Sequence, residues 1–282
     1  MKDLMCCLNG DWLPLENANV NVLTHTLHYG AGAYEGLRSY DGKLFQLEAH
    51  TQRLFRSAQL LGLTIPYTPQ QMNTWQKEVI QRNHLKEAYL RPLIFLGQGT
   101  MSLDIRALPV QVLIAAWPWD ALHAHSKGIH LKTVSIRKLA ISSTKIKAKA
   151  VGHYLNSALA VQEAKLAGAD EALLLDQKGF VCEGSGQNLF FVKDQALFTP
   201  TLETALDGIT RQTVIEIAHR KGLKVTEGDF TLEELKTADE ILLCGTATEI
   251  VAVRLLDGQD IGNGVYPITT MLQEEYQALV YA

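Results

Sequence analysis

The sequence lacks three features that would each define a class of protein. With 26 basic and 30 acidic residues its net charge is −4, so no basic surface for a nucleic acid is indicated. The longest apolar run, Val112–Trp119, is interrupted by Pro118, whereas a membrane-spanning helix needs about 20 apolar residues. At the N-terminus, Asp3 and Asn9 fall where a signal peptide needs an apolar run of about 7–15 residues. We therefore expect a cytoplasmic protein that binds neither membrane nor nucleic acid.

The sequence also lacks the residue patterns that several kinds of functional site require. None of the four cysteines forms a CxxC pair, and buried thiols account for them. Nine histidines are present, but no neighbouring cysteine or carboxylate completes a metal-ligand set. There is no GxSxG motif, and Gly30, Gly32 and Gly36 miss the dinucleotide-binding spacing by one residue. We therefore expect no metal site, no serine hydrolase and no Rossmann-type cofactor site.

The length of the chain predicts two domains, since 282 residues compare with about 150 residues per domain. A strand predicted over Val110–Trp117 ends at Pro118, and a polar stretch follows over residues 120–128. We expect an α/β (α+β) protein with a small N-terminal α/β domain over residues 1–119. A short interdomain loop over residues 120–128 would join it to a larger C-terminal α/β domain over residues 129–282, which carries Lys149.

The pattern of apolar and turn residues predicts the main elements within these domains. Asp41-Gly42 between two alternating runs is typical of a hairpin. Strands are expected over residues 129–136 and, as a meander, over residues 172–175, 180–183 and 188–192. Thr231 and Glu234 have the spacing of a capping box. Helices are expected over Leu47–Leu61 before Gly62, over Pro69–Asn83 and over Gly152–Gly168.

A run of alternating lysines is the first candidate for chemistry. Lys145, Lys147 and Lys149 point to one side of an extended segment. Neighbouring positive charges favour the neutral form of an amine, which is the nucleophile needed to form a Schiff base. A solvated basic loop is the plainer explanation of this run taken alone.

Two turns of small residues are candidates for an anion site. Gly208, Ile209 and Thr210 open an amphipathic helix, and the free N–H groups of a helix start suit a phosphate. Thr246 and Ala247 follow a strand predicted over residues 241–244. A simple helix cap or turn is the alternative explanation for each.

One cofactor requires all of these groups together with a carboxylate, which Glu183 supplies at a strand end. Pyridoxal phosphate needs an amine for its aldehyde and N–H donors for its phosphate. It also needs an anion that keeps its ring nitrogen protonated. The combination therefore predicts pyridoxal 5'-phosphate as the cofactor.

Seven short motifs follow one another along nearly the whole chain. They are His28-Tyr29-Gly30 with Tyr34-Glu35-Gly36-Leu37-Arg38, Gln52-Arg53-Leu54, Tyr89-Leu90-Arg91-Pro92, Lys149-Ala150 with Tyr154-Leu155, Glu183-Gly184-Ser185-Gly186-Gln187-Asn188-Leu189-Phe190, Gly208-Ile209-Thr210-Arg211, and Gly245-Thr246-Ala247 with Glu249-Ile250. In this order they resemble the fold-type IV (class IV) pyridoxal-phosphate aminotransferases, and within them the branched-chain amino acid aminotransferases. The resemblance implies a two-domain, cytoplasmic homodimer of branched-chain amino acid biosynthesis. It also implies transfer of the amino group of L-leucine, L-isoleucine or L-valine to 2-oxoglutarate, by a ping-pong route through pyridoxamine phosphate.

The resemblance also implies the residues of the cofactor site. Lys149 matches the catalytic lysine that binds the cofactor covalently and then moves the proton between the substrate Cα and the cofactor C4′. Glu183 matches the carboxylate that faces the ring nitrogen, and Tyr154 matches the phenol near the ring hydroxyl. The residues that match the phosphate site are Arg53, Ile209, Thr210 and Thr246. Without the resemblance, Arg53 would be assigned to a helix surface.

The substrate site is implied in the same way. The residues that match the group receiving the α-carboxylate are Tyr89, Thr246 and Ala247. Arg91 matches the residue that binds the distal carboxylate of 2-oxoglutarate, and Tyr34 and Trp119 match the pocket walls. Tyr29 matches a wall residue contributed by the neighbouring subunit, which implies a homodimer or higher homo-oligomer with shared active sites. Plain core packing is the alternative for these aromatic residues.

Three positions depart from the pattern of many relatives. Gln187 stands where a carboxylate is common, His153 where an asparagine is common, and Leu122 where an aromatic residue is common. These changes bear on the substrate range and not on the reaction type.

Three other activities on the same fold would use the same Lys149 and Glu183: a D-amino acid aminotransferase, an R-selective amine transaminase and an aminodeoxychorismate lyase. Relatives with the first and last of these activities usually lack the Tyr-Glu-Gly-Leu-Arg pattern. A non-catalytic metabolite-binding protein on this scaffold is a further alternative. The presence of both chemical groups argues against it.

Overall fold

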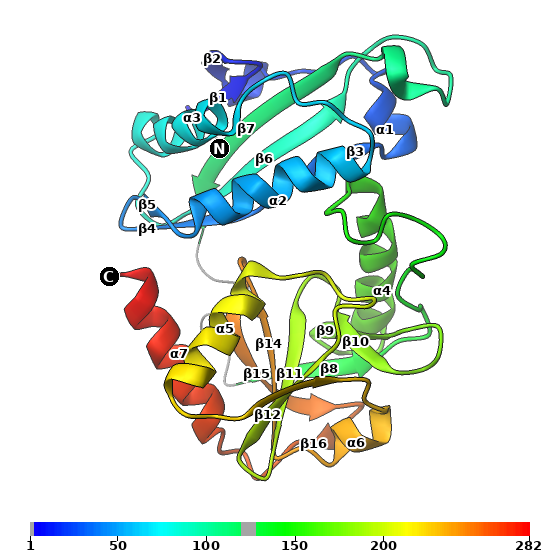
Figure 1. The fold of residues 1–282 in the computed structure, drawn as a ribbon, viewed down its shortest axis with the longest axis vertical. Helices are drawn as coiled ribbons and strands as arrows, with labels where there is room; N and C mark the ends of the chain where they lie inside the picture. Colours follow the sequence, from blue (N-terminus) through cyan, green and yellow to red (C-terminus); the bar gives the residue numbers. More distant parts are fainter. Residues whose placement is uncertain (1–2, 120–127) are drawn as a thin grey trace. The chain divides into compact units, whose positions relative to one another are not determined.

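The contacts of the chain divide it into two compact units (Figure 1). The computed structural model describes residues 3–119 and 128–282. Unit 1 comprises Met1–Asp120 and Lys147–Tyr154, and unit 2 comprises Ala121–Ile146 and Leu155–Ala282. Lys149 is therefore grouped with unit 1. The domain boundaries expected from the sequence stay a prediction, since most of the expected loop, residues 120–127, lies outside the described residues.

Unit 1 is built on a seven-stranded antiparallel sheet with the order β2-β1-β7-β6-β4-β5, in which β3 also pairs with β6. Its strands are β1 (Met5–Leu8), β2 (Asp11–Pro14), β3 (Gly32–Tyr34), β4 (Leu37–Tyr40), β5 (Lys43–Leu44), β6 (Ala88–Leu96) and β7 (Val110–Pro118). Its helices are α1 (His25–Tyr29), α2 (Leu47–Leu60) and α3 (Pro69–Arg82). The 3-10 turns are Leu15–Asn17 and Ile105–Ala107.

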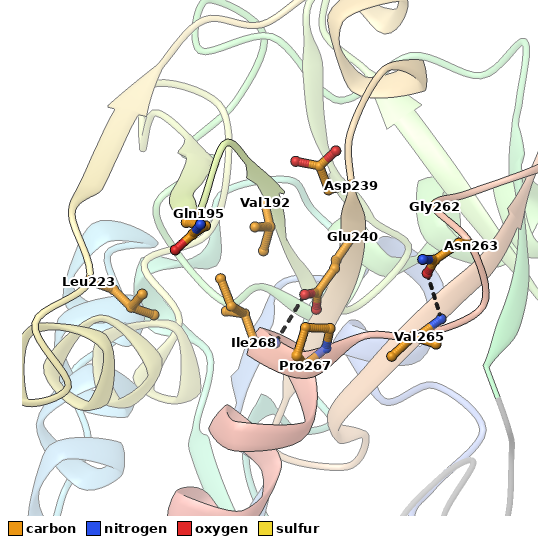
Figure 2. A pocket seen from close by; sticks show the side chains of 10 residues that line it. All are labelled: Val192, Gln195, Leu223, Asp239, Glu240, Gly262, Asn263, Val265, Pro267 and Ile268. Carbon is orange, nitrogen blue, oxygen red and sulfur yellow. Dashed lines mark hydrogen bonds between the residues drawn. The ribbon is translucent and has the colours of Figure 1, made fainter.

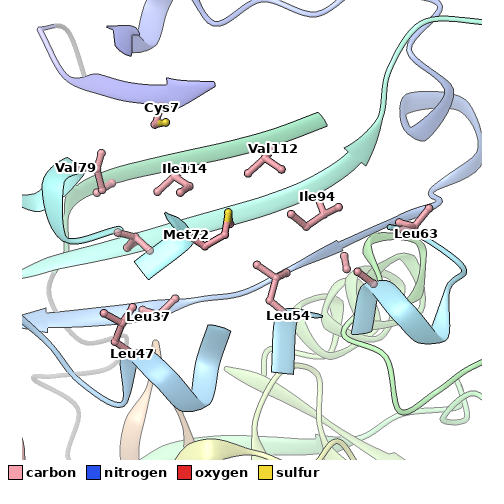
Figure 3. Packing of buried hydrophobic residues seen from close by; sticks show 14 of the residues in the cluster. Cys7, Leu37, Leu47, Leu54, Leu63, Met72, Val79, Ile94, Val112 and Ile114 are labelled. Atoms are coloured by element: carbon pink, nitrogen blue, oxygen red, sulfur yellow. The ribbon is translucent and has the colours of Figure 1, made fainter. Parts of the chain in front are cut away.

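The core of unit 1 lies between the sheet and helices α2 and α3 (Figure 3). Leu54 from α2 and Met72 from α3 are fully buried and pack with Ile94 of β6. Helix α3 begins at a capping box in which Thr68 accepts from the Gln71 amide at 3.2 Å. Burial of this apolar face, more than helix propensity, holds the two helices on the sheet.

Three expectations for unit 1 are confirmed by its local structure. The hairpin turns at Asp41-Gly42, both at positive φ, between the pairs Tyr40↔Lys43 and Ser39↔Leu44. The second expected feature, Gly62, ends α2 with a φ of 73°, a conformation that glycine adopts without strain. The third is the helix expected over residues 69–83, which extends over Pro69–Arg82.

Unit 2 is built on a nine-stranded mixed sheet with the order β10-β9-β8-β15-β14-β11-β12-β13, with β16 paired to β15. Its strands are β8 (Ile129–Thr133), β9 (Glu171–Leu175), β10 (Val181–Gly184), β11 (Asn188–Lys193), β12 (Ala196–Pro200), β13 (Val225–Gly228), β14 (Glu240–Gly245), β15 (Glu249–Leu256) and β16 (Gln259–Asp260). The helices are α4 (Tyr154–Leu166), α5 (Ile209–Arg220), α6 (Leu232–Lys236) and α7 (Pro267–Val280). The 3-10 turn Val151–His153 that precedes α4 groups with unit 1. Tyr154, the first residue of α4, groups with unit 1.

The sheet of unit 2 closes on itself because β10 pairs with β9 on one side and with β11 on the other. Leu131, Leu189 and Leu243 from three of its strands share one buried cluster. Helices α5 and α7 pack on each other and on β14. The closure brings the ends of β10, β11 and β14 together, since Glu183 pairs with Asn188 and Asn188 pairs with Cys244.

Two elements, β8 and α4, differ by two or more residues from the expected boundaries. The strand expected over residues 129–136 ends at Thr133. Beyond it, Ser135 bonds through both its amide and its hydroxyl to the Glu163 carboxylate, each at 2.7 Å, in place of a strand partner. The helix expected from Gly152 begins at Tyr154, because the Gly152 amide donates to the Gly30 carbonyl at 3.1 Å. None of the helices in the described parts of the chain is long and apolar enough to cross a membrane.

Candidate active site

The main chain at Lys149 is tied to two elements of unit 1. Its amide donates to the Ser57 hydroxyl of α2 at 3.0 Å, and its carbonyl accepts from the Tyr34 amide of β3 at 3.1 Å. A β-bridge between Ala33 and Ala150 continues the pairing. The position of the Lys149 side chain is therefore set by the sheet and not by a free loop.

The amine of Lys149 lies among phenol rings. Nζ donates to the Tyr154 hydroxyl at 2.8 Å and lies 5.0 Å from the centre of the Tyr34 ring. The Tyr34 and Tyr154 rings meet edge to face at 4.9 Å. Burial, together with the nearby Tyr154, raises the pKa of Tyr34, so this phenol keeps its proton across the physiological range. Nζ is therefore oriented by a phenol oxygen and sits beside a neutral ring.

Arg91 continues this group of side chains. Tyr89 and Arg91, two residues apart on β6, project from the same face of the sheet. The Arg91 guanidinium lies 4.5 Å from the Tyr34 ring centre, and its Nη2 donates to the Tyr89 hydroxyl at 3.4 Å. The Tyr89 and Trp119 rings are 5.7 Å apart. We call Tyr34, Tyr89, Arg91, Trp119, Lys149 and Tyr154 the Lys149 cluster.

The Lys149 cluster holds donors that the described residues leave without a partner. Arg91 Nε and Trp119 Nε1 are both buried and make no hydrogen bond to any of the described residues. Buried polar atoms nearly always have a partner, so two such donors in one cluster indicate a polar ligand. A guanidinium lined by aromatic rings suits a carboxylate.

Gly36 has a steric role beside this cluster. A Cβ at this position would lie 1.8 Å from the Tyr89 hydroxyl oxygen. Any other residue would therefore push Tyr89 away from Arg91. This contact explains the glycine of the Tyr34-Glu35-Gly36 motif.

Arg53 belongs to a buried charged triad in unit 1, with Glu35 and His50. Arg53 donates to Glu35 through Nε at 2.6 Å and through Nη2 at 2.9 Å, and His50 Nδ1 lies 2.8 Å from the same carboxylate. The position of Arg53 on a helix surface, expected without the resemblance, is wrong, because its side chain is buried. Sequence reasoning gave no role to Glu35 or His50, although Glu35 stands inside a quoted motif.

The triad sets the charge of its members. Burial by itself raises the pKa of Glu35, but Arg53 and His50 outweigh it and hold the pKa well below its ordinary range. Burial lowers the pKa of His50 despite its contact with Glu35, so the imidazole is neutral at pH 7. Glu35 is therefore an anion that fixes one edge of the Arg53 guanidinium.

Glu183 lies at the end of β10 in unit 2, with donors on both of its oxygens. Oε2 accepts from Asn188 Nδ2 at 3.1 Å and from the Leu206 amide at 3.2 Å. Oε1 contacts Nζ of Lys138 in an ion pair. Sequence reasoning found Glu183 but missed Lys138, which is distant from every quoted motif.

The start of α5 lies close to this carboxylate. Gly208, the N-cap of α5, has no side-chain cap, and Ile209 and Thr210 in the first turn are buried. A Cβ at Gly208 would lie 1.9 Å from Oδ1 of Asn188, the residue that holds Glu183. A buried helix start without a capping side chain leaves N–H groups that suit a phosphate.

The turn that contains Thr246 and Ala247 joins β14 to β15 at the same end of the sheet. It is linked to the β10–β11 turn by Gln187, whose Nε2 lies 3.4 Å from the Thr248 hydroxyl. The same amide donates to Glu171 at 2.9 Å, and its oxygen accepts from the Gly186 amide at 3.0 Å. Gln187 thus bridges the two turns and a buried carboxylate.

Each unit therefore gathers its share of the expected site residues, with one exception. Tyr29 is 48% exposed, and its hydroxyl donates to the Met101 carbonyl at 3.3 Å, so it lies apart from the Lys149 cluster. Of the departing positions, His153 lies in the turn before α4, and Leu122 lies outside the described residues.

A cavity of about 730 Å³ in unit 2 contains none of the expected site residues (Figure 2). Its walls include Val192, Leu223 and Val265. Glu240, also in its wall, accepts from the Ile268 amide at 3.0 Å and so serves as a cap for α7. The chemistry expected from the sequence is therefore not located in this cavity.

Comparison with known proteins identifies the family. A family model described as amino-transferase class IV matches residues 32–256. The branched-chain-amino-acid aminotransferase of Pseudomonas aeruginosa is 41% identical over 287 residues, which cover 99% of this chain and 94% of that protein. The branched-chain-amino-acid aminotransferase of Escherichia coli K12 is 38% identical over 281 residues, with coverages of 96% and 91%.

Solved structures agree with these relatives. The T.th. branched-chain amino acid aminotransferase complexed with N-(5'-phosphopyridoxyl)-L-glutamate matches with a TM-score of 0.96 and 39% identity, over 100% of this chain and 95% of that one. A second structure of that enzyme, with pyridoxamine 5'-phosphate, also gives a TM-score of 0.96 at 39% identity and the same coverages.

The chain belongs to the class IV aminotransferases. Within that class, the relatives and structures named above are branched-chain amino acid aminotransferases, as the motifs indicate. The predictions of the family, of its mixed α/β fold with two domains, of an aminotransferase and of a pyridoxal phosphate cofactor are confirmed at the level of the family. The roles of individual residues stay predictions.

The Glu35 triad yields a prediction about stability. Glu35→Gln removes a buried anion from beside the buried Arg53 guanidinium, so we expect a loss of about 3–5 kcal/mol in the free energy of unfolding at pH 7. Because the pKa of Glu35 is lower in the folded than in the unfolded chain, its contribution is present above about pH 4.3 and is lost as the pH falls towards the folded pKa. The difference between wild type and variant should therefore shrink below about pH 4.

Urea unfolding followed by tryptophan fluorescence measures this effect in unit 1, since all four tryptophans lie within residues 12–119. Glu48→Gln is the matched control, because Glu48 is exposed on the same helix as Arg53, and it should change the free energy by less than about 1 kcal/mol. Equal effects of the two substitutions at pH 7 would contradict the prediction.

Proposed function

We propose that this aminotransferase transfers the amino group of L-leucine, L-isoleucine or L-valine to 2-oxoglutarate. The observation that carries the proposal is the Lys149 cluster, where an amine, three phenols and a guanidinium with an unpartnered donor lie together. The names of the relatives support the branched-chain substrates. Arg91 supports an acceptor with a second carboxylate.

The described residues fit pyridoxal phosphate as cofactor. Lys149 would hold it covalently, and Tyr154 and Glu183 would contact its ring hydroxyl and ring nitrogen. The start of α5, which lacks a side-chain cap, supports a phosphate at Ile209 and Thr210. We assign Thr246 and Arg53 to the same phosphate from the resemblance of their motifs alone. When bound, the cofactor supplies an aldehyde and a ring that accepts electrons.

The chain's own residues handle the proton. After release from the cofactor, the Lys149 amine would take the proton from the substrate Cα and would deliver it to the C4′ atom of the cofactor. The hydrogen bond from Nζ to Tyr154 orients the amine for both transfers. The two main-chain hydrogen bonds of Lys149 keep it in place while its side chain is free.

One pocket must accept both an aliphatic side chain and a carboxylate. Tyr34, Tyr89 and Trp119 offer ring faces for the aliphatic group, and Arg91 offers the charge for the carboxylate. We assign the α-carboxylate of the substrate to Tyr89 together with Thr246 and Ala247. The face of an aromatic ring stabilises a guanidinium that lies over it. Arg91 can therefore move aside for an aliphatic side chain without its charge facing only apolar groups.

The active unit is proposed to be a homodimer. Unit 1 exposes a set of large apolar side chains around α1, namely Val20, Val22, Leu23, Leu27 and Tyr29, together with Leu103. Exposed apolar patches of this kind mark protein interfaces. In such a dimer Tyr29 would reach the site of the partner subunit.

A cytoplasmic enzyme of branched-chain amino acid biosynthesis is the proposed setting. The four cysteines, Cys6, Cys7, Cys182 and Cys244, are free and buried, which fits a reducing compartment. Burial raises the pKa of the Cys182 and Cys244 thiols to about 12, so neither is a nucleophile at pH 7.

The test of the function follows the visible absorption of the protein loaded with cofactor. Excess L-leucine without an oxo acid should bleach the visible band, and 2-oxoglutarate should restore it, because each half-reaction needs only one substrate. Lys149→Ala should lose turnover by several orders of magnitude, since the nucleophile and the proton carrier are removed together. Lys147→Ala is the neighbouring control.

The stereochemistry of the donor separates the alternatives. Bleaching by D-amino acids or by simple amines, with no response to L-leucine, would favour a D-amino acid aminotransferase or an amine transaminase. Release of pyruvate from aminodeoxychorismate would favour the lyase. Full turnover by Lys149→Ala would remove the assignment of the catalytic lysine.

Arg91 yields a prediction about specificity. Arg91→Met removes the cation but keeps most of the side-chain volume, so the KM for 2-oxoglutarate and for glutamate should rise about 10- to 100-fold. The KM for L-leucine, which has no second carboxylate, should change less than about threefold. Steady-state kinetics with both donors measures the contrast, and Arg56→Met, at an exposed position of α2, is the control. A parallel rise for leucine would show that Arg91 has only a structural role.

The dimer yields a separate prediction. Leu27→Asp places a charge on a side chain that is 65% exposed, so the single chain should fold normally while association is lost. Sedimentation velocity should show a dimer for the wild type and a monomer for the variant. Leu166→Asp is the control, because Leu166 is 84% exposed and lies on α4 of unit 2, so it is not one of the residues of this patch. A dimer that survives Leu27→Asp would exclude this patch as the interface.

A further inference from the structure

The two carboxylate oxygens of Glu183 have partners of different kinds. Among the described residues, Oε2 accepts from two neutral groups, the Asn188 side-chain amide and the Leu206 main-chain amide. Oε1 contacts the ammonium of Lys138. The side chain of Glu183 is 6% exposed and that of Lys138 is 20% exposed, so water screens this ion pair only weakly.

The main chain of Lys138 is held on both sides. Its amide donates to the Leu175 carbonyl at 2.9 Å, and its carbonyl accepts from Gln177 Nε2 at 2.8 Å. Leu175 is the last residue of β9, which pairs with β10, and Glu183 lies on β10. The two charged groups are therefore attached to neighbouring strands, and their contact is built into the sheet.

An ammonium on one oxygen changes how the carboxylate shares a proton. A cation that touches a carboxylate strongly stabilises its anionic form. The same cation destabilises a protonated nitrogen that is hydrogen-bonded to the carboxylate less, because that nitrogen is farther away. In a buried hydrogen bond between a carboxylate and a ring nitrogen, the proton can lie on either atom, and apolar surroundings favour the neutral pair. The ammonium counteracts that preference.

We propose that Lys138 is a positioning residue for the reaction: its contact with Oε1 keeps Glu183 anionic, so that the proton of the Glu183 hydrogen bond stays on the cofactor's ring nitrogen. This inference rests on the proposed function, in which Glu183 faces that nitrogen. The step moves only one proton, between the ring nitrogen and the Glu183 carboxylate, and needs no other reactant. The ring accepts electrons well only while the nitrogen carries the proton.

The test uses the holoenzyme loaded with pyridoxal phosphate that is labelled with ¹⁵N in the ring. The ¹⁵N chemical shift of the bound cofactor reports directly whether the nitrogen is protonated. In the wild type we expect the shift of a protonated ring. In Lys138→Met it should move towards the shift of a neutral ring, and kcat with L-leucine should fall on the order of tenfold.

Three further variants make the result specific. Lys138→Arg keeps the charge and should keep the wild-type shift. Lys138→Gln keeps a hydrogen-bond donor without the charge, so its ¹⁵N shift should lie between those of the wild type and Lys138→Met. If Lys138→Met fails to fold, Lys138→Gln takes its place as the uncharged variant. Lys132→Met is the control, because it removes a lysine that pairs with Asp257 at 3.0 Å elsewhere in unit 2.

Glu183→Gln separates the two levels of the argument. If Glu183→Gln moves the ¹⁵N shift and both uncharged Lys138 variants leave it unchanged, the inference about Lys138 is overturned and the role of Glu183 stands. If Glu183→Gln leaves the shift unchanged, the proposed role of Glu183 falls, and the inference falls with it. Movement in Glu183→Gln and in the uncharged Lys138 variants, with none in Lys138→Arg and Lys132→Met, supports both.

Discussion

The main-chain pairing of residues 149–152 with unit 1 is the constraint on which the Lys149 cluster depends. Tyr34 donates to the Lys149 carbonyl, Ser57 accepts from the Lys149 amide, and Gly152 donates to Gly30. A Cβ at Gly30 would lie 2.9 Å from the Gly152 Cα, so this approach requires glycine. Because the pairing ends there, α4 starts at Tyr154, and the Tyr154 hydroxyl is placed at the Lys149 amine. The Lys149 amine is thus positioned by the sheet and by a helix start together.

Buried charge in this protein is compensated locally, one carboxylate at a time. Glu35 pairs with Arg53, Glu183 with Lys138, and Glu240 with the amides at the start of α7. Such pairs add little net stability, since the cost of removing charges from water offsets their attraction. Their effect is on geometry: each fixes the orientation of a buried side chain. Arg53 and Glu183 are also residues for which the sequence predicts a role in the cofactor site.

Short motifs in the sequence identified residues of the candidate site. The structure explains why some residues of the site could be found in this way and others could not. Lys149 and Glu183 were predicted from residue type in combination with two turns of small residues, and Arg91 was predicted only through the resemblance of its motif. Lys138 stands 45 residues before Glu183 in the chain, and only the pairing of β9 with β10 brings it to the carboxylate. Burial of Arg53 depended likewise on a partner 18 residues away. Helices and strands were predicted well where the apolar periodicity was strong. The predicted end of β8 was wrong because the Glu163 side chain, and not a neighbouring strand, binds Ser135.

Gln187 illustrates how a substitution can alter a site without altering its framework. Its amide oxygen accepts from Gly186, and its amide nitrogen donates to Glu171, so both turns keep their hydrogen bonds. A carboxylate at this position would have no proton to donate and would face the buried Glu171 carboxylate, and the pair would have to bind a proton or another cation. With the amide, Glu171 is satisfied without either. The turn that carries Thr246 and Ala247 therefore keeps its position with one negative charge fewer nearby. The hydrogen bonds of Gln187 involve neither Lys149 nor Glu183.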